Sequence, residues 1–202
     1  YDTLQSAHSV GWQSSWCMNA ETRQKILDAA LQAILESGYR ASVDDIARRA
    51  GVVKQTIYHH FAGKDALFAE TVRCMAESVR VSLDEEPADL RSCLLRFAAV
   101  YREKVFGGTG ISLHRVLVSE VARFPELARA VFAANLGETR RRLAATLSRA
   151  MALGKLRRED PEFASEMLLG MLTGIEHGRC VFNAELPTDK APERAGRIVD
   201  CF

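Results

Sequence analysis

The sequence predicts an all-α fold, with a small N-terminal domain of three helices that contains a helix-turn-helix and a larger C-terminal helical domain. Apolar residues recur at helical spacing along most of the chain, and no alternating run typical of a half-buried strand reaches a useful length. The stretch 42–61 has the pattern of two short helices joined by a tight turn. With 202 residues, of which 48% are hydrophobic, the chain can form one large or two small domains with a real core.

The first helix of the pair is predicted over 43–50. Ser42 can act as its N-cap, and Asp44 and Asp45 in the first turn suit the positive end of the helix dipole. Gly51 ends the helix, because a glycine just past the last turn tolerates a left-handed backbone. One buried face is formed by the apolar residues at helical spacing, which are Val43, Ile46, Ala47 and Ala50.

The second helix is predicted from about Val53 to Phe61, with Ile57 and Phe61 packing inward. Its other faces carry side chains that can hydrogen-bond to base edges in a major groove or to phosphate oxygens. We therefore expect DNA contacts from Ser42, Lys54, Gln55, Thr56, Tyr58, His59, His60 and Lys64. The alternative is a plain helical corner whose outer face is only solvated.

The run from Glu21 to about Val72 resembles the DNA-binding domain of TetR-type transcriptional repressors. The resemblance covers about a quarter of the chain and joins many positions at fixed offsets. Residues 123–127 more weakly resemble a helix junction in the ligand-binding half of some of these repressors. The matching positions are Ile26, Ala29, Ala30, Leu35, Gly38-Tyr39, the Val43–Val52 and Thr56–Phe61 segments, Lys64, Asp65 and Leu67.

One position departs from the family pattern. The family usually has a small hydroxyl residue where Val53 stands, and that side chain caps the recognition helix and can hold a phosphate. Val53 can do neither, at a cost of about 0.5–2 kcal/mol for a lost cap. Either Thr56 and the backbone amides take the phosphate, or affinity for the operator is weaker than usual.

The rest of the chain is also predicted to be helical. Asp84–Pro87 breaks the first of these helices, and Gly107–Gly110 is expected to be a flexible turn, since no Gly-Lys-Ser/Thr follows it as in a phosphate-binding loop. Asp160 and Pro161 are a cap and a first helical residue. The predicted helices cover 64–83, 88–106, 111–123, 125 to about 154, 161 to beyond 178, and about 191–202.

These elements divide into residues 20–66 as the DNA-binding domain and 67–202 as a domain for ligand binding and dimerisation. The helix that starts at Lys64 passes from one to the other. Residues 1–19 are expected to be an appendage, with Met18 as a candidate start, and the alternative is an ordered arm. The chain ends at Cys201-Phe202 without a helix cap, which suggests that it continues or was cut at that point.

The resemblance implies a small-molecule inducer that binds within the larger domain. Aromatic, histidine and methionine side chains on its helices are the candidates for the ligand pocket, although each of them is also what an ordinary core uses. These candidates are Phe97, Tyr101, His114, Leu117, Phe124, Met167 and Met171.

Three glycines, Gly170, Gly174 and Gly178, repeat every four residues and would lie along one stripe of a regular helix. Each costs about 1 kcal/mol inside a helix, so the stripe suggests that another helix approaches closely. We expect a dimer interface here that includes His177, completed by the last helix. The alternative is a tight contact within one subunit.

The resemblance implies a dimeric repressor that binds a palindromic double-stranded DNA operator and is released by a small apolar ligand. A formal net charge of +1 does not oppose this, because a small domain can be locally basic. Alternatives are a helical interaction protein without a DNA role and a thiol redox-sensing regulator. The second would use some of the five cysteines, which have no CxxC or metal-like spacing.

Other classes have no support in the sequence. We find no nucleophile elbow, no HExxH and no dinucleotide fingerprint, so neither an enzyme nor a bound cofactor or metal is expected. No run of eighteen apolar residues and no secretory signal appear, so a cytoplasmic location without a membrane partner is expected.

Overall fold

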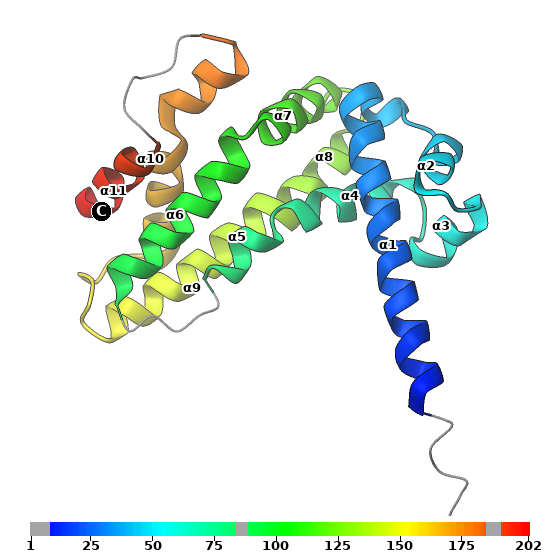
Figure 1. The fold of residues 1–202 in the computed structure, drawn as a ribbon. Coiled ribbons are helices and arrows are strands. Elements are labelled where there is room, and N and C mark those ends of the chain that lie inside the picture. Colours follow the sequence, from blue (N-terminus) through cyan, green and yellow to red (C-terminus); the bar gives the residue numbers. More distant parts are fainter. Residues whose placement is uncertain (1–8, 84–88, 185–190) are drawn as a thin grey trace, which may run out of the picture. The chain divides into compact units, whose positions relative to one another are not determined.

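The computed structural model describes residues 9–83, 89–184 and 191–202. All regular structure in these ranges is helical, which confirms the predicted fold class (Figure 1). The chain divides into two compact units, the first ending at Thr71 and the second beginning at Val72. Helix α4 (Lys64–Met75) begins in the first unit and ends in the second.

The first unit is built on the long helix α1 (Ser9–Ser37), which a short 3₁₀ turn (Gly38–Arg40) follows. Helices α2 (Val43–Ala50) and α3 (Lys54–His60) both lie on one side of α1 (Figure 1). The backbone of 9–19 belongs to α1, whereas the rest of the predicted appendage lies outside the described residues. The apolar faces meet in a core of Ile26, Ala30, Ile34, Ile46, Ile57 and Leu67.

The turn between α2 and α3 has the geometry that the sequence predicts. The Ser42 hydroxyl accepts a hydrogen bond from the Asp45 backbone at 3.0 Å, so it caps α2. Gly51 adopts φ 69°, a left-handed conformation that favours glycine. The Val52 amide then donates to the Ala47 carbonyl at 3.0 Å, which closes a Schellman motif and sets the direction in which α3 leaves.

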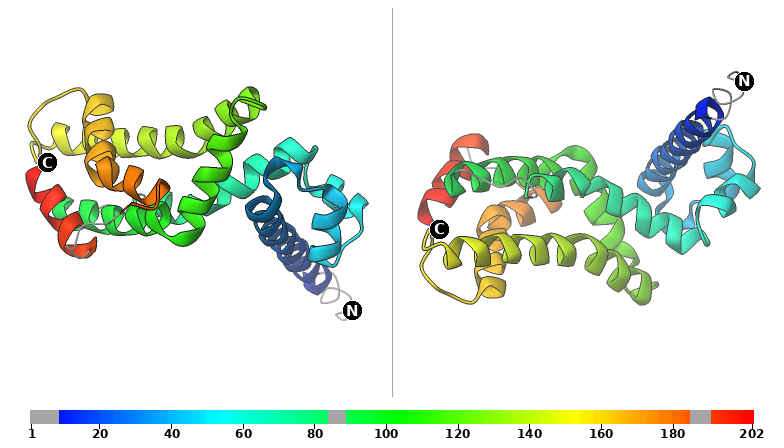
Figure 2. Two further views of the ribbon diagram at one scale, coloured as in Figure 1. Left: turned by 90° about the horizontal axis from the view of Figure 1, so that it is seen from above. Right: turned by 90° about the horizontal axis from the view of Figure 1, so that it is seen from below.

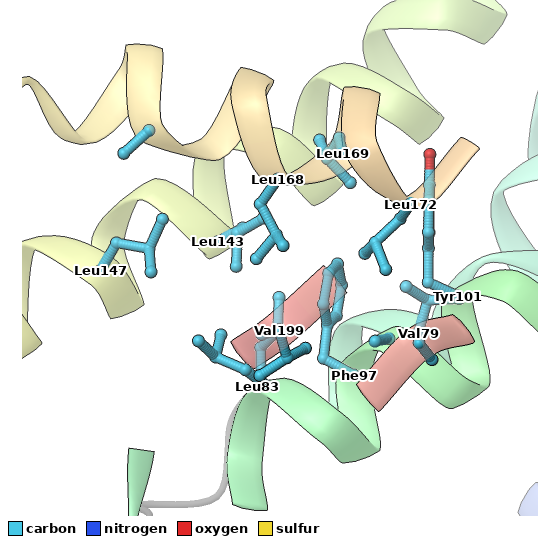
Figure 3. Packing of buried hydrophobic residues seen from close by; sticks show 14 of the residues in the cluster. Val79, Leu83, Phe97, Tyr101, Leu143, Leu147, Leu168, Leu169, Leu172 and Val199 are labelled. Atoms are coloured by element: carbon cyan, nitrogen blue, oxygen red, sulfur yellow. The ribbon is translucent and has the colours of Figure 1, made fainter. Parts of the chain in front are cut away.

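The second unit contains the end of α4 and all later helices. In order these are α5 (Glu77–Val81), α6 (Leu90–Phe106), α7 (Gly108–Glu120), α8 (Pro125–Phe132), α9 (Glu138–Ala152), α10 (Pro161–Val181) and α11 (Ala191–Cys201). Helix α10 lies between α6 and α9 (Figure 2). The leucines of α9 and α10 face Phe97 of α6 and Val199 of α11 in the main core (Figure 3). Asp160 caps α10 as predicted, accepting from the Glu162 amide at 3.1 Å.

Three helices that the sequence predicts as continuous are interrupted. The helix predicted over 64–83 stops at Ala76, where a turn separates α4 from α5. The helix predicted from Pro125 contains a π-helical turn over Ala133–Gly137, between α8 and α9. Helix α10 is kinked at Gly174, whose φ of 47° and ψ of −150° are not helical. The predicted break at 84–87 lies outside the described residues.

The kink corrects the prediction of a single glycine stripe. A regular helix would align Gly170, Gly174 and Gly178, but Gly174 separates them into two helical segments with different directions. The alternative of a tight contact within one subunit is also wrong. A Cβ added at any of the three glycines would meet no described atom within 4 Å.

A buried arginine donates to a backbone carbonyl beside each sharp break. The carbonyls that precede an interruption lose their regular partners and need other donors. At the first break, Arg80 is 1% exposed and its Nη2 donates to the Arg73 carbonyl at 2.8 Å. Its Nη1 reaches the Ala134 carbonyl of the π turn at 3.4 Å, and its charge is paired with Glu77.

Arg102 of α6 has the same role at the kink in α10. Its Nη1 donates to the Leu172 carbonyl at 2.6 Å, and its Nη2 lies 2.9 Å from both carboxylate oxygens of Glu176. Arg194 of α11 also binds Glu176, at 3.0 Å. The guanidinium carbon of Arg102 lies 4.5 Å from the centre of the Phe106 ring, and the Nε atom of Arg102 is buried without an acceptor among the described residues. This Arg102 clamp therefore joins α6, both segments of α10, and α11.

The predicted flexible turn at Gly107–Gly110 is wrong. Only Gly107 separates α6 from α7, and the other three residues form the first turn of α7. The reason is a close approach of two backbones. A Cβ on Gly110 would lie 1.9 Å from the Lys104 carbonyl oxygen and 2.9 Å from that of Val105, so only glycine lets α7 start there.

Replacing Gly110 with alanine should therefore lower the free energy of unfolding by about 1–3 kcal/mol, the usual cost of overpacking. The matched control is Gly108→Ala, because a Cβ there meets nothing within 4 Å. Urea denaturation of both variants measures the difference. Equal stabilities would show that the α6–α7 junction adjusts without cost.

Replacing Arg102 with methionine should lower the free energy of unfolding by about 3–5 kcal/mol, because the Leu172 carbonyl loses its guanidinium donor and Glu176 keeps only Arg194. Arg91→Met is the control, since Arg91 pairs with Asp200 where both side chains are more than half exposed. Thermal unfolding of the two variants should give a large decrease in Tm for Arg102→Met and little change for Arg91→Met. A similar decrease in both would contradict a structural role of the clamp.

Candidate functional site

The outward face of α3 presents the side chains expected to contact DNA. Ile57 is 1% and Phe61 6% exposed, so the predicted inward face is confirmed. Gln55, Tyr58 and His59 are exposed on the opposite side. Thr56 and His60 are half-buried at its edges, and burial lowers the pKa of His60, so this imidazole is neutral at physiological pH.

Lys54 is held by a carboxylate on the preceding helix. Its Nζ lies 2.9 Å from Oδ2 of Asp44, and the hydrogen bond raises the pKa of Lys54. Both groups are largely exposed, so the pair can open at little cost. A phosphate approaching Lys54 must therefore compete with Asp44.

Three other predicted residues have local roles. Ser42 is exposed but uses its oxygen to cap α2. Val53 gives no side-chain cap to α3, in agreement with the predicted departure from the family pattern. Lys64 lies at the start of α4, where its ammonium group donates to the Tyr39 carbonyl and lies 4.3 Å from the centre of the Tyr39 ring.

The second unit contains a cavity of about 510 Å³. The three helix interruptions all contribute to its wall: Ala76 comes from the α4–α5 break, Asn135 from the π turn, and Thr173 from beside the kink in α10. Its lining residues are Val72, Met75, Ala76, Val79, Tyr101, Lys104, Val105, Gly110, Leu113, His114, Leu117, Val118, Val121, Ala128, Val131, Phe132, Asn135, Leu136, Thr139, Thr173 and His177.

Three of the seven predicted pocket residues, Tyr101, His114 and Leu117, line this cavity. The other four lie elsewhere. Phe97 is fully buried in the main core, because α6 turns that face toward α9 and α10. Phe124 precedes α8 and contacts the Arg123 guanidinium, 5.3 Å from its ring centre. The side chains expected in the pocket from α10, Met167 and Met171, are exposed.

His177, predicted at a dimer interface, also lines the cavity and faces His114 of α7. Their ring centres are 4.5 Å apart, with the rings nearly perpendicular. Burial lowers the pKa of both imidazoles, and His114 lowers that of His177 further, so the two are neutral at physiological pH. Burial raises the pKa of the Tyr101 phenol to about 12, so this group stays a hydrogen-bond donor.

Helix α10 also carries an exposed apolar surface. Its members are Phe163, Met167, Met171 and Ile175, together with Phe182 just beyond the helix. Large exposed apolar side chains gathered on one helix are typical of protein–protein interaction surfaces. The glycines Gly170, Gly174 and Gly178 lie on the same helix with open space above them, so a partner helix could approach closely there.

In the comparisons with known proteins, a separate family model matches each of the two compact units. Residues 26–71 match the model of the bacterial regulatory proteins of the TetR family. Residues 92–202, more than half of the chain, match the model of the C-terminal domain of AefR-like transcriptional repressors. The chain belongs to the TetR family. The resemblance seen in the sequence is thereby confirmed, and α2 and α3 are the helix-turn-helix of a TetR-family regulator.

Individual TetR-family proteins support the assignment. The regulator SrpR of Pseudomonas putida is 51% identical over 45 residues, which are 22% of this chain and 21% of SrpR. The chain thus spans about a fifth of the length of this curated relative. The structure named flavonoid-responsive regulator FrrA has a TM-score of 0.71 and 31% identity over 91% of this chain and 95% of its own. A TetR-family regulator of Pseudomonas syringae pv. tomato DC3000 has a TM-score of 0.61 and 30% identity, over 89% of this chain and 91% of its own.

Most of the cavity wall was not predicted from the sequence. Two polar residues that the sequence did not assign to it are Lys104, on α6, and Asn135, in the π turn. Their helical positions are compatible with either a solvated or a lining role, so no local signal distinguishes the two. In the described part of the chain, no group of three or more histidine, cysteine, aspartate or glutamate side chains could hold a metal ion. None of its helices combines the length and apolarity needed to cross a bilayer.

The Lys54–Asp44 pair makes a prediction about binding to DNA. Asp44→Asn should raise the affinity for any duplex and steepen its salt dependence by up to about one ion, because Lys54 no longer shares its charge with a carboxylate. Asp28→Asn is the matched control. It makes the same change of charge on α1, where the Asp28 carboxylate accepts a hydrogen bond from the neutral Gln24 side chain. Fluorescence anisotropy at several salt concentrations measures both, and equal effects would show that only net charge matters.

Proposed function

We propose that this protein is a ligand-responsive repressor that binds a palindromic DNA operator as a homodimer and releases it when a small molecule fills the cavity. The observation that carries the proposal is the exposed face of α3 within a TetR-family helix-turn-helix. The name of the matching C-terminal model, an AefR-like transcriptional repressor, supports repression rather than activation. A regulator of bacterial genes acts where the chromosome is, in the cytoplasm.

DNA recognition is assigned to α3 by its chemistry. Gln55 can bind adenine with two hydrogen bonds, and Lys54 can reach a guanine edge or a phosphate. Tyr58, which is 50% exposed, and Thr56 suit phosphate oxygens or a thymine methyl group. His59, His60, Ser42 and Lys64 surround this face and complete the proposed DNA contacts.

The small size of this face supports dimerisation. One seven-residue helix reads only a few base pairs, and two copies related by a two-fold axis double the footprint. The exposed apolar residues of α10, with the glycines among them, support a homodimer interface. Two recognition helices then fit half-sites about 34–36 Å apart, or a multiple of this distance.

Ligand control requires only that the ligand prefers one arrangement of the dimer. A small molecule shifts the population by its difference in affinity for the two arrangements, not by its affinity alone. His177 and Thr173 line the cavity on α10, and the exposed apolar residues lie on the same helix. A ligand that moves this wall therefore moves the proposed interface. Neither an interaction protein without a DNA role nor a thiol sensor has a specific observation in its favour.

Selection from a randomised duplex library, followed by gel shifts on the selected sequences, tests the proposal. We expect a two-fold symmetric motif, and a weaker shift when one half-site is scrambled. Recovery of no motif, or of one unpaired half-site, would reject the dimeric operator.

Two variants on the selected duplex assign the residues. Gln55→Ala should relax the preference at one base position by about 1–3 kcal/mol. Lys64→Ala should weaken binding to all sequences and reduce the salt slope by about one ion, if its ammonium group exchanges the Tyr39 carbonyl for a phosphate. Lys155→Ala, an exposed lysine in the other unit, is the control and should change neither quantity.

A further inference from the structure

The charge inside the cavity indicates which class of ligand it accepts, given the ligand-responsive function proposed above. None of its lining residues is an aspartate or a glutamate. Lys104 lines the cavity and is exposed, and no carboxylate of the described residues pairs with it. A buried ammonium ligand would therefore have no counter-charge here, which is a large cost.

A second positive group lies next to His114. The guanidinium of Arg115 donates only to neutral oxygens, which are the carbonyls of Val181 at 2.9 Å and Cys180 at 2.7 Å and the Asn183 side chain at 2.6 Å. Its charge is thus not compensated by a carboxylate in the described part of the chain. Glu176, the neighbour of His177, is already bound by Arg102 and Arg194. The potential around the histidine pair therefore favours an anion.

The histidine pair itself is suited to one negative charge. Each neutral imidazole has one donor nitrogen and one acceptor nitrogen. With ring centres 4.5 Å apart, one imidazole can gain a proton beside an anion, but two imidazolium ions would repel each other. The Tyr101 hydroxyl on the adjacent wall is a further donor.

The rest of the cavity has few free polar groups. The hydroxyls of Thr139 and Thr173 donate to the Asn135 and Leu169 carbonyls, both at 2.9 Å. Val118, Val121 and Phe132 line the cavity while they are 45–61% exposed, so an apolar rim leads to solvent. A ligand must therefore combine one polar head with an apolar body.

The geometry points to an apolar weak acid, bound as its monoanion, as the ligand. Its carboxylate or phenolate is received by His114 and His177, with Tyr101 donating a hydrogen bond and Lys104 at the solvent side. Its body contacts the aliphatic wall and the apolar rim. Cationic molecules of the same shape are excluded.

Binding should be coupled to proton uptake. Burial lowers the pKa of both histidines in the empty cavity, so each is neutral, and an anion beside them raises the pKa again. Affinity for a carboxylate should then increase as pH falls from about 8 to 6, while the ligand itself stays ionised. The other titratable or charged groups on the elements around the pair are Tyr101, Arg102, Glu103 and Lys104 on α6, Arg115 and Glu120 on α7, Glu176, Arg179 and Cys180 on α10, and Arg194 on α11.

Calorimetry with matched probes tests this assignment on the full chain. The aromatic set is biphenylacetate, biphenylethylamine and biphenylethanol, and the acyl set is decanoate, decylamine and decanol. In at least one set the carboxylate should bind about tenfold or more tightly than the amine and the alcohol. Titrations in buffers of different ionisation enthalpy should show uptake of up to about one proton for the carboxylate and none for the alcohol. The set that binds distinguishes an aryl acid from an acyl acid.

Variants identify the groups responsible. Glutamine keeps hydrogen-bonding capacity but cannot take up a proton. The single variants His114→Gln and His177→Gln each leave one imidazole that can gain the proton, whereas the double variant should abolish proton uptake and remove the preference for the carboxylate. Binding of the alcohol should persist in all three variants, which shows that the cavity is intact. Lys104→Gln should weaken only the carboxylate, whereas Lys155→Gln, an exposed lysine outside the cavity, is the matched control and should have no effect.

Three results would overturn the assignment: an amine or alcohol that binds as tightly as its carboxylate, a carboxylate preference that survives the double histidine variant, or no binding of either set. DNA binding of the same preparation to its selected duplex is measured separately. If that binding is intact while the probes fail, only the ligand class is rejected. If DNA binding is absent, the proposed function fails, and the calorimetric comparison still decides the ligand class.

Discussion

Two buried guanidinium groups hold the second unit together where its helices depart from regular geometry. Arg80 and Arg102 each donate to a carbonyl beside a helix break and pair with one glutamate. Loss of such a donor removes a buried hydrogen bond to a charged group, which contributes about 1.5–3 kcal/mol. Because the breaks and the π turn all contribute to the cavity wall, these arginines stabilise the backbone that lines the cavity.

The same arrangement relates the cavity to the rest of α10. Gly174 divides this helix, and the segment after it carries His177 and is held by Arg102 from α6, Arg115 from α7 and Arg194 from α11. A group that binds His177 acts on a short segment with several polar attachments and little buried apolar surface. Such a segment can change its position at a lower free-energy cost than a core helix. A ligand that prefers one of its positions can therefore shift the population toward that position.

The first unit meets a different constraint, which is to present polar groups in a constant direction. The Schellman turn at Gly51 and the buried Ile57 and Phe61 fix the orientation of α3. The exposed side chains of α3 can therefore be mobile while the backbone that carries them is not. Asp44 adds a local competitor for Lys54. We expect such a pair to lower affinity for DNA in general and to leave discrimination to the groups that contact bases.

The sequence by itself determined the helix-turn-helix, its inward and outward faces, the caps at Ser42 and Asp160, and the helical class of the whole chain. These depend on signals within a few residues, such as a capping oxygen, a glycine with positive φ and the spacing of apolar side chains. Only the tertiary structure decided the breaks at Ala76 and Gly174, the π turn and the meeting of His114 with His177. The donors involved come from far away, since Arg80 is 54 residues from Ala134 and Arg102 is 70 residues from Leu172. No local pattern encodes such partners, and for this reason Phe97 and Met171 were placed in the pocket while Lys104 and Asn135 were missed.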